Sequence, residues 1–285
     1  LHGVADPPRP TVNDRIWNWT IRRDFPCYAA VIAVADEVAD SCAARYALEK
    51  RPQVIANLTD VDLVVAQGLE AAPPPFRSGT RLVFVGRISP EKGLSRLLVA
   101  LSRLRREGRT DWSLDVVGDG ADRMVCERVA KAEGLGDFVR FAGMQENPQP
   151  FLHAADLLVV PSYHEGCPCV VAEALLNGTA VLATDCGGTR TALRGGQWGL
   201  LVENTDEALY KGLRQVLEEL EDLLRRTDFS AITAEIKEII TDKIIISFAF
   251  EWFFKKETVF LKSLIILFSF SRKEKWKMKA QINIM

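Results

Sequence analysis

Two glutamates eight residues apart, Glu165 and Glu173, follow the apolar run at 157–160. Gly166 and Pro168 then lead into an apolar segment that predicts a helix, and the first backbone amides of a helix can bind an anion or a hydroxyl group. A helix that begins near Pro168 carries Glu173 about one turn in, where it faces the same cleft as Glu165 without touching it. Carboxylates in these positions predict hydrogen bonds to two sets of hydroxyls. A solvated helix position is the alternative for Glu173, which its apolar neighbours disfavour.

A second chemical pattern is the segment Val-Gly-Arg-Ile-Ser-Pro-Glu-Lys-Gly at residues 85–93. Gly86 follows an apolar run and permits a ligand to approach the backbone closely, and the cations Arg87 and Lys92 flank a predicted helix start. Fixed cations beside free amides suit a diphosphate group. From spacing alone, an ordinary surface turn with solvated charges is the alternative.

Two glycine-rich segments add weaker signals. Gly118 and Gly120 begin a dinucleotide fingerprint, but Arg123 stands where the third glycine belongs, and no acidic residue ends a following strand at the usual distance. The sequence therefore favours a tight turn beside a ligand cleft over an NAD site. Gly187 and Gly188 also allow the backbone to approach a ligand closely, and a plain turn is equally consistent with them.

Short apolar runs alternate with helical patterns along most of the chain. Runs such as Leu-Leu-Val-Val at 157–160 indicate strands that are buried on both faces of a parallel sheet. Leucines at a helical period follow Ser89 and Pro90, which predicts a capped helix there. These repeated strand–helix units predict an α/β fold with a doubly wound, Rossmann-like parallel sheet. The predicted strands are 31–34, 53–56, 81–85, 113–117, 138–141, 157–160, 180–184 and 200–202, with further helices at 170–176 and 207–224.

Composition changes divide the chain into four parts. Ala-Ala-Pro-Pro-Pro at 71–75 predicts a linker over residues 71–79, between domains at 1–70 and 80–242. Residues 243–285 contain no Gly, Pro or Asp and carry eight Lys and one Arg against three Glu. Each of their two apolar runs is shorter than the roughly 20 residues that span a bilayer. We favour a foreign or poorly specified tail, and an interfacial segment with peripheral membrane association is the alternative.

Charge and cysteine content exclude several classes of protein. The 285 residues have a formal net charge of −2, without the basic excess that is usual in proteins that bind nucleic acid. The six cysteines form no CxxC pair and no Cys/His ligand spacing, so neither a disulfide framework nor a structural zinc site is predicted. A reducing, cytoplasmic location is therefore expected.

Taken in order, these segments resemble the nucleotide-sugar-binding half of a GT-B glycosyltransferase, in the large retaining group called family 4. The Glu-x7-Glu pair carries the resemblance best, because several further matches surround it. The resemblance covers about residues 80–218. Its other segments are Val85-Gly86-Arg87, Glu91-Lys92-Gly93, 117–120, 139–143, Ala154-Ala155-Asp156, Pro161-Ser162, 177–181 and 199–202.

The resemblance implies a role for each matched side chain. Arg87 and Lys92 would neutralise the donor's diphosphate, which becomes the leaving group, so they should affect rate as well as binding. Glu165 would hydrogen-bond hydroxyls of the donor sugar and is not expected to act as a nucleophile. Glu173 would accept hydrogen bonds from the ribose hydroxyls. The resemblance implies no bound metal and no cofactor besides the nucleoside-diphosphate sugar, because cations and helix N-termini replace the metal.

The backbone would supply the remaining contacts that the resemblance implies. Gly86 would lie against the donor, and the loop at Met144 would meet the nucleobase mostly through its backbone. The sugar and phosphates would be lined by Gly166, Cys167, Pro168 and Cys169.

Residues before the predicted linker extend the resemblance. Residues 28–38 are similar to the last strand and helix of the family's N-terminal domain, and 54–62 to the segment that follows it. His2 would match a histidine that approaches the donor sugar, and a terminal histidine without that role is the alternative. Because most of the acceptor-side domain has no counterpart in the sequence, the chain resembles an enzyme that is incomplete at its N-terminus, with a partial Rossmann-like domain at 1–70.

The function implied is transfer of a sugar, with retention, from a nucleoside-diphosphate sugar to a glycan or lipid-linked acceptor. Variants of this pattern resemble enzymes of polysaccharide or glycoconjugate synthesis. A non-catalytic nucleotide-sugar-binding fragment is one alternative. A GT-B sugar-nucleotide epimerase is another, which the spacing of Glu165 and Glu173 disfavours.

Overall fold

The computed structural model describes residues 19–24, 27–28, 30–55, 57, 59–71 and 73–239. These residues fall into two compact units, with 19–55 in the first and 57–239 in the second. His2 and the predicted tail at 243–285 lie outside the described residues. Among the described residues, no helix is both long enough and apolar enough to cross a membrane.

The first unit contains a parallel strand–helix–strand segment. Strands β1 (Ile32–Ala33) and β2 (Gln53–Val54) pair in parallel and are connected through α2 (Asp36–Tyr46). Ala33 on β1 and Ala39 on α2 are buried, so small side chains allow the helix to pack closely on the strands. The segment confirms the predicted alternation of strand and helix, with strands shorter than predicted.

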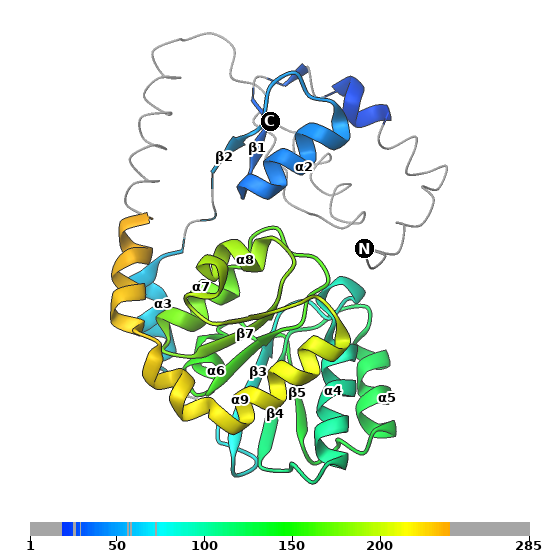
Figure 1. Cartoon of the computed structure of the whole chain (residues 1–285), viewed down its shortest axis with the longest axis vertical. Helices are drawn as coiled ribbons and strands as arrows, with labels where there is room; N and C mark the ends of the chain where they lie inside the picture. Colours follow the sequence, from blue (N-terminus) through cyan, green and yellow to red (C-terminus); the bar gives the residue numbers. More distant parts are fainter. Residues whose placement is uncertain are drawn as a thin grey trace. The chain divides into compact units, whose positions relative to one another are not determined.

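A six-stranded parallel sheet with the order β5-β4-β3-β6-β7-β8 forms the centre of the second unit (Figure 1). The strands are β3 (Thr80–Val85), β4 (Trp112–Val117), β5 (Val139–Gly143), β6 (Leu157–Val160), β7 (Ala180–Thr184) and β8 (Leu200–Val202). The α-helices are α3 (Val61–Gly68), α4 (Leu94–Arg106), α5 (Arg123–Ala132), α6 (Gln149–His153), α7 (Cys169–Leu176), α8 (Gly188–Ala192) and α9 (Asp206–Arg226). Two short 3-10 helices are η2 (Pro90–Lys92) and η3 (Arg194–Gly196), and residues 229–239 are also helical.

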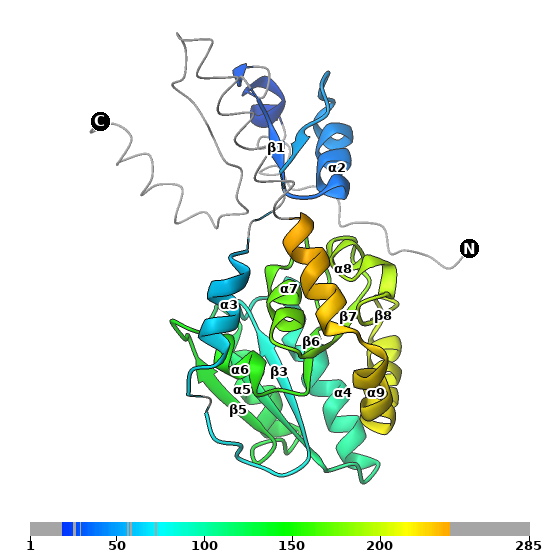
Figure 2. The ribbon, with the colours of Figure 1, turned by 90° about the vertical axis from the view of Figure 1, so that its left-hand side faces the viewer.

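Helices cover both faces of this sheet. Successive side chains of a strand point to opposite faces. In β3, Leu82 and Phe84 therefore join the core under α4, α5 and α9, whereas Val83 joins the core under α3, α6 and α7. Figure 2 shows α4 and α9 on one side of the sheet and α3 on the other. Burial on both faces explains the continuously apolar sequence of β6, Leu-Leu-Val-Val, and the helices on both faces confirm the predicted doubly wound sheet.

The helix that was predicted to begin at Pro90 begins later. Pro90 opens the short helix η2, Gly93 then adopts φ +67°, and α4 begins at Leu94. A residue in the left-handed region does not continue a right-handed helix, so Gly93 separates the two elements. As a result, Lys92 belongs to the loop after β3 and not to the long helix.

The boundary between the two units falls before residue 57, not at the predicted linker over 71–79. Helix α3 packs against α6 and α7, and its residues Val61 and Val64 are buried in the core of the second unit. The proline-rich segment also lies on this unit, because the Pro74 carbonyl accepts a 3.1 Å hydrogen bond from Arg140. Residues 73–79 form neither helix nor strand, and the burial of Val61 and Val64 places α3 in the second unit.

Candidate functional site

Lys92 and Glu165 meet where the strand order of the larger sheet reverses. Strands β3 and β6 are neighbours, but the chain continues from β3 to β4 on one side and from β6 to β7 on the other. In open α/β sheets, ligands bind beyond the carboxyl ends of the strands at such a reversal. The loops after β3 and β6 meet here, and the Tyr163 amide donates a 2.8 Å hydrogen bond to the Glu91 carbonyl.

Lys92 and Glu165, each predicted to contact a different part of a ligand, form an ion pair with each other. The Lys92 ammonium donates to Glu165 Oε1 at 2.7 Å and to Oε2 at 2.8 Å. The Ser162 hydroxyl donates to Glu165 Oε1 at 2.7 Å. The Glu165 side chain is 8% exposed and that of Lys92 is 27% exposed, so the pair compensates a largely buried carboxylate.

Gly93 allows this pair to form because it brings the two loops into close contact. A Cβ atom at this position would lie 2.0 Å from the Pro161 carbonyl oxygen, and its φ of +67° is one that other residues rarely adopt. Glycine therefore lets the segment after β3 pack directly on the segment after β6. Lys92, one residue before, is held beside Glu165.

Arg96, in the first turn of α4, fixes the loop that carries Glu165. The residue is 5% exposed, and burial lowers the pKa of its guanidinium from the usual value. The Tyr163 ring stacks over it, with 3.8 Å between Arg96 Cζ and the ring centroid. The guanidinium connects the ends of β6 and β7 with the segment after β8. It donates to Pro161 O (2.7 Å), Ser162 O (2.8 Å), Thr184 Oγ1 (3.1 Å) and Asn204 Oδ1 (2.8 Å).

Glu173 is half-buried on α7, as its apolar neighbours indicated, and Gln149 fixes its orientation. Gln149 Nε2 donates to Glu173 Oε2 at 3.0 Å, while Gln149 Oε1 accepts a 2.8 Å hydrogen bond from Asn177. Gln149 itself is 5% exposed, so both ends of its amide are held inside the protein. Glu165 and Glu173 thus have different partners, which suits carboxylates that bind different groups of one ligand.

Cys167 and Cys169 flank Pro168 where α7 begins. Cys169 Sγ lies 3.8 Å from the Cys167 carbonyl oxygen and accepts a 3.2 Å hydrogen bond from Asn57 Nδ2. Hydrogen bonding with Cys167 and with Asn57 lowers the pKa of Cys169 to about 6, although burial and the charge of Glu173 raise it. At neutral pH most Cys169 side chains are therefore thiolates.

The glycine-rich loop after β7 supports the backbone at Glu165. Glu165 and Gly187 form an isolated parallel bridge, and the Gly188 amide donates to the Glu165 carbonyl at 3.3 Å. A Cβ atom at residue 188 would lie 2.6 Å from that oxygen, so the glycine permits the close approach. Next to this contact, burial raises the pKa of Cys186.

Arg87 lies at the exposed surface of the loop after β3. Its positive charge lowers the pKa of the nearby Glu91 carboxyl. Burial raises the pKa of Glu91, but the Ser89 hydroxyl at 2.7 Å and the charges of Arg87 and Lys92 outweigh it, so that the net shift is downward. The loop therefore presents cationic groups around a carboxylate that stays ionised.

The other predicted backbone contacts also lie at the carboxyl ends of strands. The Gly86 amide donates to Val117 O at 3.0 Å, which continues the pairing of β3 with β4. Met144 follows β5 directly and is 74% exposed, so the side chain itself makes little contact with the protein. Both positions are consistent with the predicted backbone contacts to a ligand.

Arg123 replaces the third glycine of the dinucleotide fingerprint with an ion-paired side chain. It bonds to Asp119 at 2.9 Å and to Glu127 at 2.8 Å. Hydrogen bonds from the Gly120 amide and from Arg123 lower the pKa of Asp119. The segment is thus a turn closed by its own charges.

Arg96, Gln149 and Asn57 hold the site together, but sequence patterns did not identify them as site residues. Arg96 gave one usable signal, because it lies one turn before the apolar Ala100 on the same helix. Gln149 and Asn57 gave none, because their partners lie 24 and 112 residues away along the chain.

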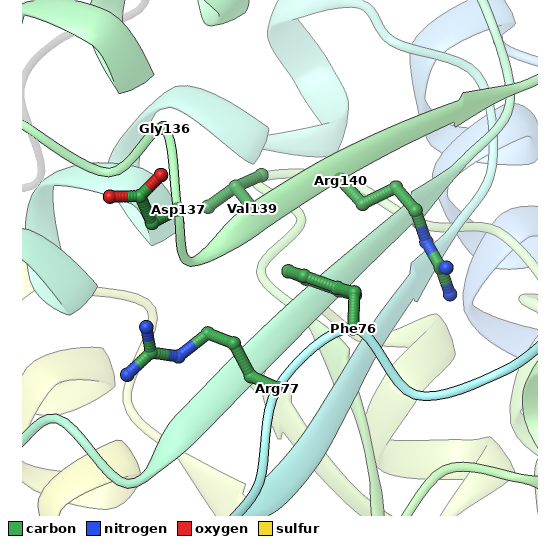
Figure 3. Close-up of a pocket in the computed structure, with 6 residues that line it drawn as sticks. All are labelled: Phe76, Arg77, Gly136, Asp137, Val139 and Arg140. Atoms are coloured by element: carbon green, nitrogen blue, oxygen red, sulfur yellow. The ribbon is translucent and has the colours of Figure 1, made fainter.

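A separate pocket of about 500 Å³ lies at the amino end of β5, away from these loops (Figure 3). Arg140 lies over the Phe76 ring at 4.8 Å and bonds to the buried Asp115 at 2.6 and 3.0 Å. The pocket is lined by Phe76, Arg77, Gly136, Asp137, Val139 and Arg140.

Within the part of the chain that the structure describes, no group of three or more His, Cys, Asp or Glu is placed to hold a metal ion.

Sequence comparisons identify relatives of the second unit. Residues 79–219 match the family "Glycosyl transferases group 1". The lipopolysaccharide core biosynthesis glycosyltransferase LpsE of Rhizobium meliloti (strain 1021) is 33% identical over 166 residues, which cover 58% of the chain and 47% of that protein. The D-inositol 3-phosphate glycosyltransferase of Thermomonospora curvata is 38% identical over 164 residues, which cover 53% of the chain and 37% of that protein. The chain thus spans about half or less of the length of these relatives.

Solved structures confirm the fold. TarM from S. aureus, in complex with fondaparinux, alpha-GlcNAc-glycerol and UDP, gives a TM-score of 0.66 at 18% identity, covering 86% of this chain and 48% of TarM. HepE from Anabaena, in complex with UDP and glucose, gives a TM-score of 0.62 at 20% identity, covering 85% of this chain and 70% of HepE. These neighbours are GT-B glycosyltransferases, so the GT-B fold expected from the resemblance is confirmed.

Proposed function

We propose that this chain, which carries a glycosyltransferase group 1 domain at residues 79–219, contains the donor site of a retaining, family 4 glycosyltransferase. The donor is a nucleoside-diphosphate sugar, and UDP is the nucleotide that we favour because TarM and HepE were solved with it. The acceptor is a glycan or a lipid-linked sugar of a cell-surface polysaccharide or glycoconjugate, assembled on the cytoplasmic side. The name of LpsE, a lipopolysaccharide core enzyme, supports this acceptor class.

The observation that carries the proposal is the ion pair of Lys92 and Glu165 at the reversal of strand order. The proposal assigns the ammonium of this pair to the diphosphate and its carboxylate to the sugar hydroxyls. An ammonium has three N–H donors, and Lys92 directs two of them to Glu165. A third can reach a phosphate oxygen without breaking the pair, so donor binding needs no exposure of an unpaired carboxylate.

Charge development explains how the same residues assist transfer. Breaking the bond between the sugar and the diphosphate builds negative charge on the departing phosphate oxygen. Lys92 and the exposed Arg87 stabilise this charge more in the transition state than in the bound donor, which raises the rate. Glu165 binds hydroxyls and is a poor nucleophile, because Lys92 and Ser162 already donate to its carboxylate.

Retention then follows from attack of the acceptor on the face that the leaving group departs. The acceptor hydroxyl approaches the anomeric carbon beside the departing phosphate, and that phosphate takes the hydroxyl proton. Glu173 binds the ribose hydroxyls in this scheme. Its hydrogen bond from Gln149 holds the carboxylate in position before the donor arrives, which lowers the entropic cost of binding.

The test is calorimetric titration of the full chain with UDP, GDP and ADP, together with the Glu173→Ala variant. We expect saturable binding of one nucleotide. Removing the ribose contact should cost about 1–3 kcal/mol of binding free energy, or about fivefold to 150-fold in affinity. Glu238→Ala, a change of an exposed glutamate on the helix at 229–239, is the matched control and should bind as the unchanged chain does.

An unchanged UDP affinity in Glu173→Ala would sink the role of Glu173. If no nucleotide binds to the folded chain, the donor site itself is contradicted. Nuclear magnetic resonance of the chain with UDP-GlcNAc separates the remaining activities. Inversion of a carbon in the donor sugar would show an epimerase. Retained configuration in a transferred or hydrolysed sugar is the outcome that we expect.

A further inference from the structure

Cys167 and Cys169 are separated only by Pro168 in the loop that we assign to the donor. The proposed sugar transfer does not use their thiols. Pro168 between them has φ −76° and ψ 91°, close to the values of an inverse γ-turn. Such a turn draws the flanking Cα atoms together, below the two 3.80 Å steps of an extended segment. A disulfide needs Cα atoms within about 7 Å. The Cα separation of Cys167 and Cys169 is therefore compatible with a disulfide.

Cys169 differs from the other half-buried and buried thiols in its surroundings. The Asn57 amide donates to its sulfur at 3.2 Å, and it is the first residue of α7, where backbone amides and the helix dipole favour a negative charge. Hydrogen bonding with Cys167 and Asn57 lowers the pKa of Cys169 to about 6. Burial instead raises the pKa values of Cys126 and Cys186. A partly exposed thiolate beside a second cysteine is the arrangement found in cysteines that react with peroxide.

We propose that Cys169 and Cys167 are an oxidation site, where a hydroperoxide converts the two thiols into a disulfide that closes the donor site. The claim about the thiols stands on the loop geometry and on the surroundings of Cys169, and it needs no ligand. The claim about donor binding rests on the proposed function.

The chemistry proceeds in two balanced steps. The Cys169 thiolate attacks one oxygen of the hydroperoxide, the O–O bond breaks, and the sulfur loses two electrons to become a sulfenic acid. The departing oxygen takes up a proton and leaves as water or alcohol. The Cys167 thiol then attacks the Cys169 sulfur, the S–O bond breaks, and the S–S bond forms as the hydroxyl leaves with the thiol proton as water.

The disulfide changes the loop at the residues that face the donor. It turns the Cys169 sulfur toward Cys167, removes its negative charge and so loses the hydrogen bond from Asn57. The backbone amides of Gly166, Cys167 and Cys169 then move with the sulfur, because Pro168 leaves this short segment little freedom. Since these amides line the sugar and phosphates in the proposed site, the oxidised chain should bind UDP at least about tenfold more weakly.

Mass spectrometry reads the thiol chemistry without any ligand. Cleavage after Glu165 and Glu173 by a glutamate-specific protease releases residues 166–173, which contain Cys167 and Cys169 but not Cys186. After hydrogen peroxide treatment of the full chain, we expect this peptide to lose the mass of two hydrogen atoms and to regain it with dithiothreitol. Oxidation that is confined to Cys27 or Cys42, with 166–173 still a dithiol, would overturn the proposal.

Titration of the same samples with UDP measures the effect of the disulfide on nucleotide affinity. The peroxide-treated chain should lose UDP affinity and recover it with dithiothreitol, and Cys186→Ser should respond in the same way. In Cys167→Ser no disulfide can form, so Cys169 should stop at the sulfenic acid, which dimedone traps. A disulfide that leaves UDP affinity unchanged would overturn its effect on the site. If the reduced chain binds no nucleotide, the proposed function fails, while the peptide mass still decides the thiol chemistry.

Discussion

Lys92 and Glu165 form a largely buried ion pair in the proposed donor site. A carboxylate that is 8% exposed is costly without a partner, and Lys92 supplies that partner at 2.7 Å. The ammonium keeps a donor for a phosphate oxygen, and the carboxylate keeps lone pairs for hydroxyls. The pair therefore prepares two contacts at one point, which is the residue-scale basis of the proposed function.

Replacing Lys92 separates its contact with phosphate from the rest of the site. We expect Lys92→Ala to weaken UDP binding about tenfold to 150-fold, since a charge-assisted hydrogen bond contributes about 1.5–3 kcal/mol. Binding of uridine, which lacks the diphosphate, should change much less. Calorimetric titration with both ligands measures the difference.

Two further variants are controls for the titration of Lys92→Ala. Lys131→Ala removes an exposed lysine from α5 and should bind UDP normally. The double variant Lys92→Ala/Glu165→Gln removes the carboxylate that Lys92→Ala leaves unpaired. Equal losses for UDP and uridine in the double variant would contradict a phosphate contact.

The thiol of Cys169 gives the site a pH dependence that can be measured without ligand. Because its pKa is lowered to about 6, the thiolate forms as pH rises through 6, whereas an ordinary thiol needs a pH near 8.5. We expect alkylation of Cys169 by iodoacetamide to rise between about pH 5 and 7 and then to level off. The groups that set this are Cys167, Asn57 and Glu173.

The lowered pKa of Cys169 also makes folding stability depend on pH. A lowered pKa stabilises the folded state above the unfolded thiol's pKa, and this contribution is lost as pH falls toward 6. As a control for the alkylation experiment, the rate of alkylation of Cys169 in peptide 166–173 should be compared with that of Cys186. Burial raises the pKa of Cys186. Parallel pH profiles for the two sites would show that Cys169 is an ordinary thiol.

At the scale of elements, α4 organises the ends of three strands through one buried side chain. Arg96 donates to backbone carbonyls after β6, to Thr184 at the end of β7 and to Asn204 after β8. These three groups of partners lie in segments that are far apart in sequence. The helix therefore fixes the loop of Glu165 from behind, and the site depends on how α4 packs on the sheet.

Removing the Arg96 side chain should mainly lower the free energy of unfolding, because its hydrogen bonds are made within the protein. We expect Arg96→Met to lower the free energy of unfolding by about 3–5 kcal/mol, because it leaves several buried acceptors without a donor. Urea denaturation measures the change. Arg106→Met on the same helix removes an exposed pair with Glu133 and should change the free energy by less than about 1 kcal/mol. Similar losses in the two variants would contradict the special role of Arg96.

At the scale of the whole molecule, the larger unit contains every candidate site residue that the structure describes. Its two cores lie on opposite faces of one sheet, and α3 belongs to one of them through Val61 and Val64. Asn57 stands at the first position of this unit and bonds to Cys169. Residues 57–71, before the proline-rich stretch, are therefore part of the second unit.

Two shortened chains test where this unit begins. A chain that starts at Asn57 should fold and bind UDP within about twofold of the full chain, because a domain with its own core can fold alone. A chain that starts at residue 71 loses α3. Burial of Val61 and Val64 contributes about 1.5–3 kcal/mol each, so this chain should be less stable by about 3–6 kcal/mol. Equal stability of the two chains would place the boundary at the proline-rich segment.

The sequence by itself determined the layered α/β fold and the loops that carry the chemistry. Strands that are buried on both faces must be continuously apolar, so β6 and β7 were predicted at the bounds that the structure gives them. Glycines and charges after such strands marked the loops of Lys92, Glu165 and Glu173. These features are local, because each depends on a few neighbouring residues.

Only the tertiary structure decided which of these residues meet. The contact of Lys92 with Glu165 spans 73 residues, and that of Arg96 with Asn204 spans 108. Such pairings depend on the order of strands in the sheet, which periodicity within one strand does not encode. For the same reason, the position of α3 in the second unit followed from the burial of Val61 and Val64 against distant helices, and not from the prolines that follow it.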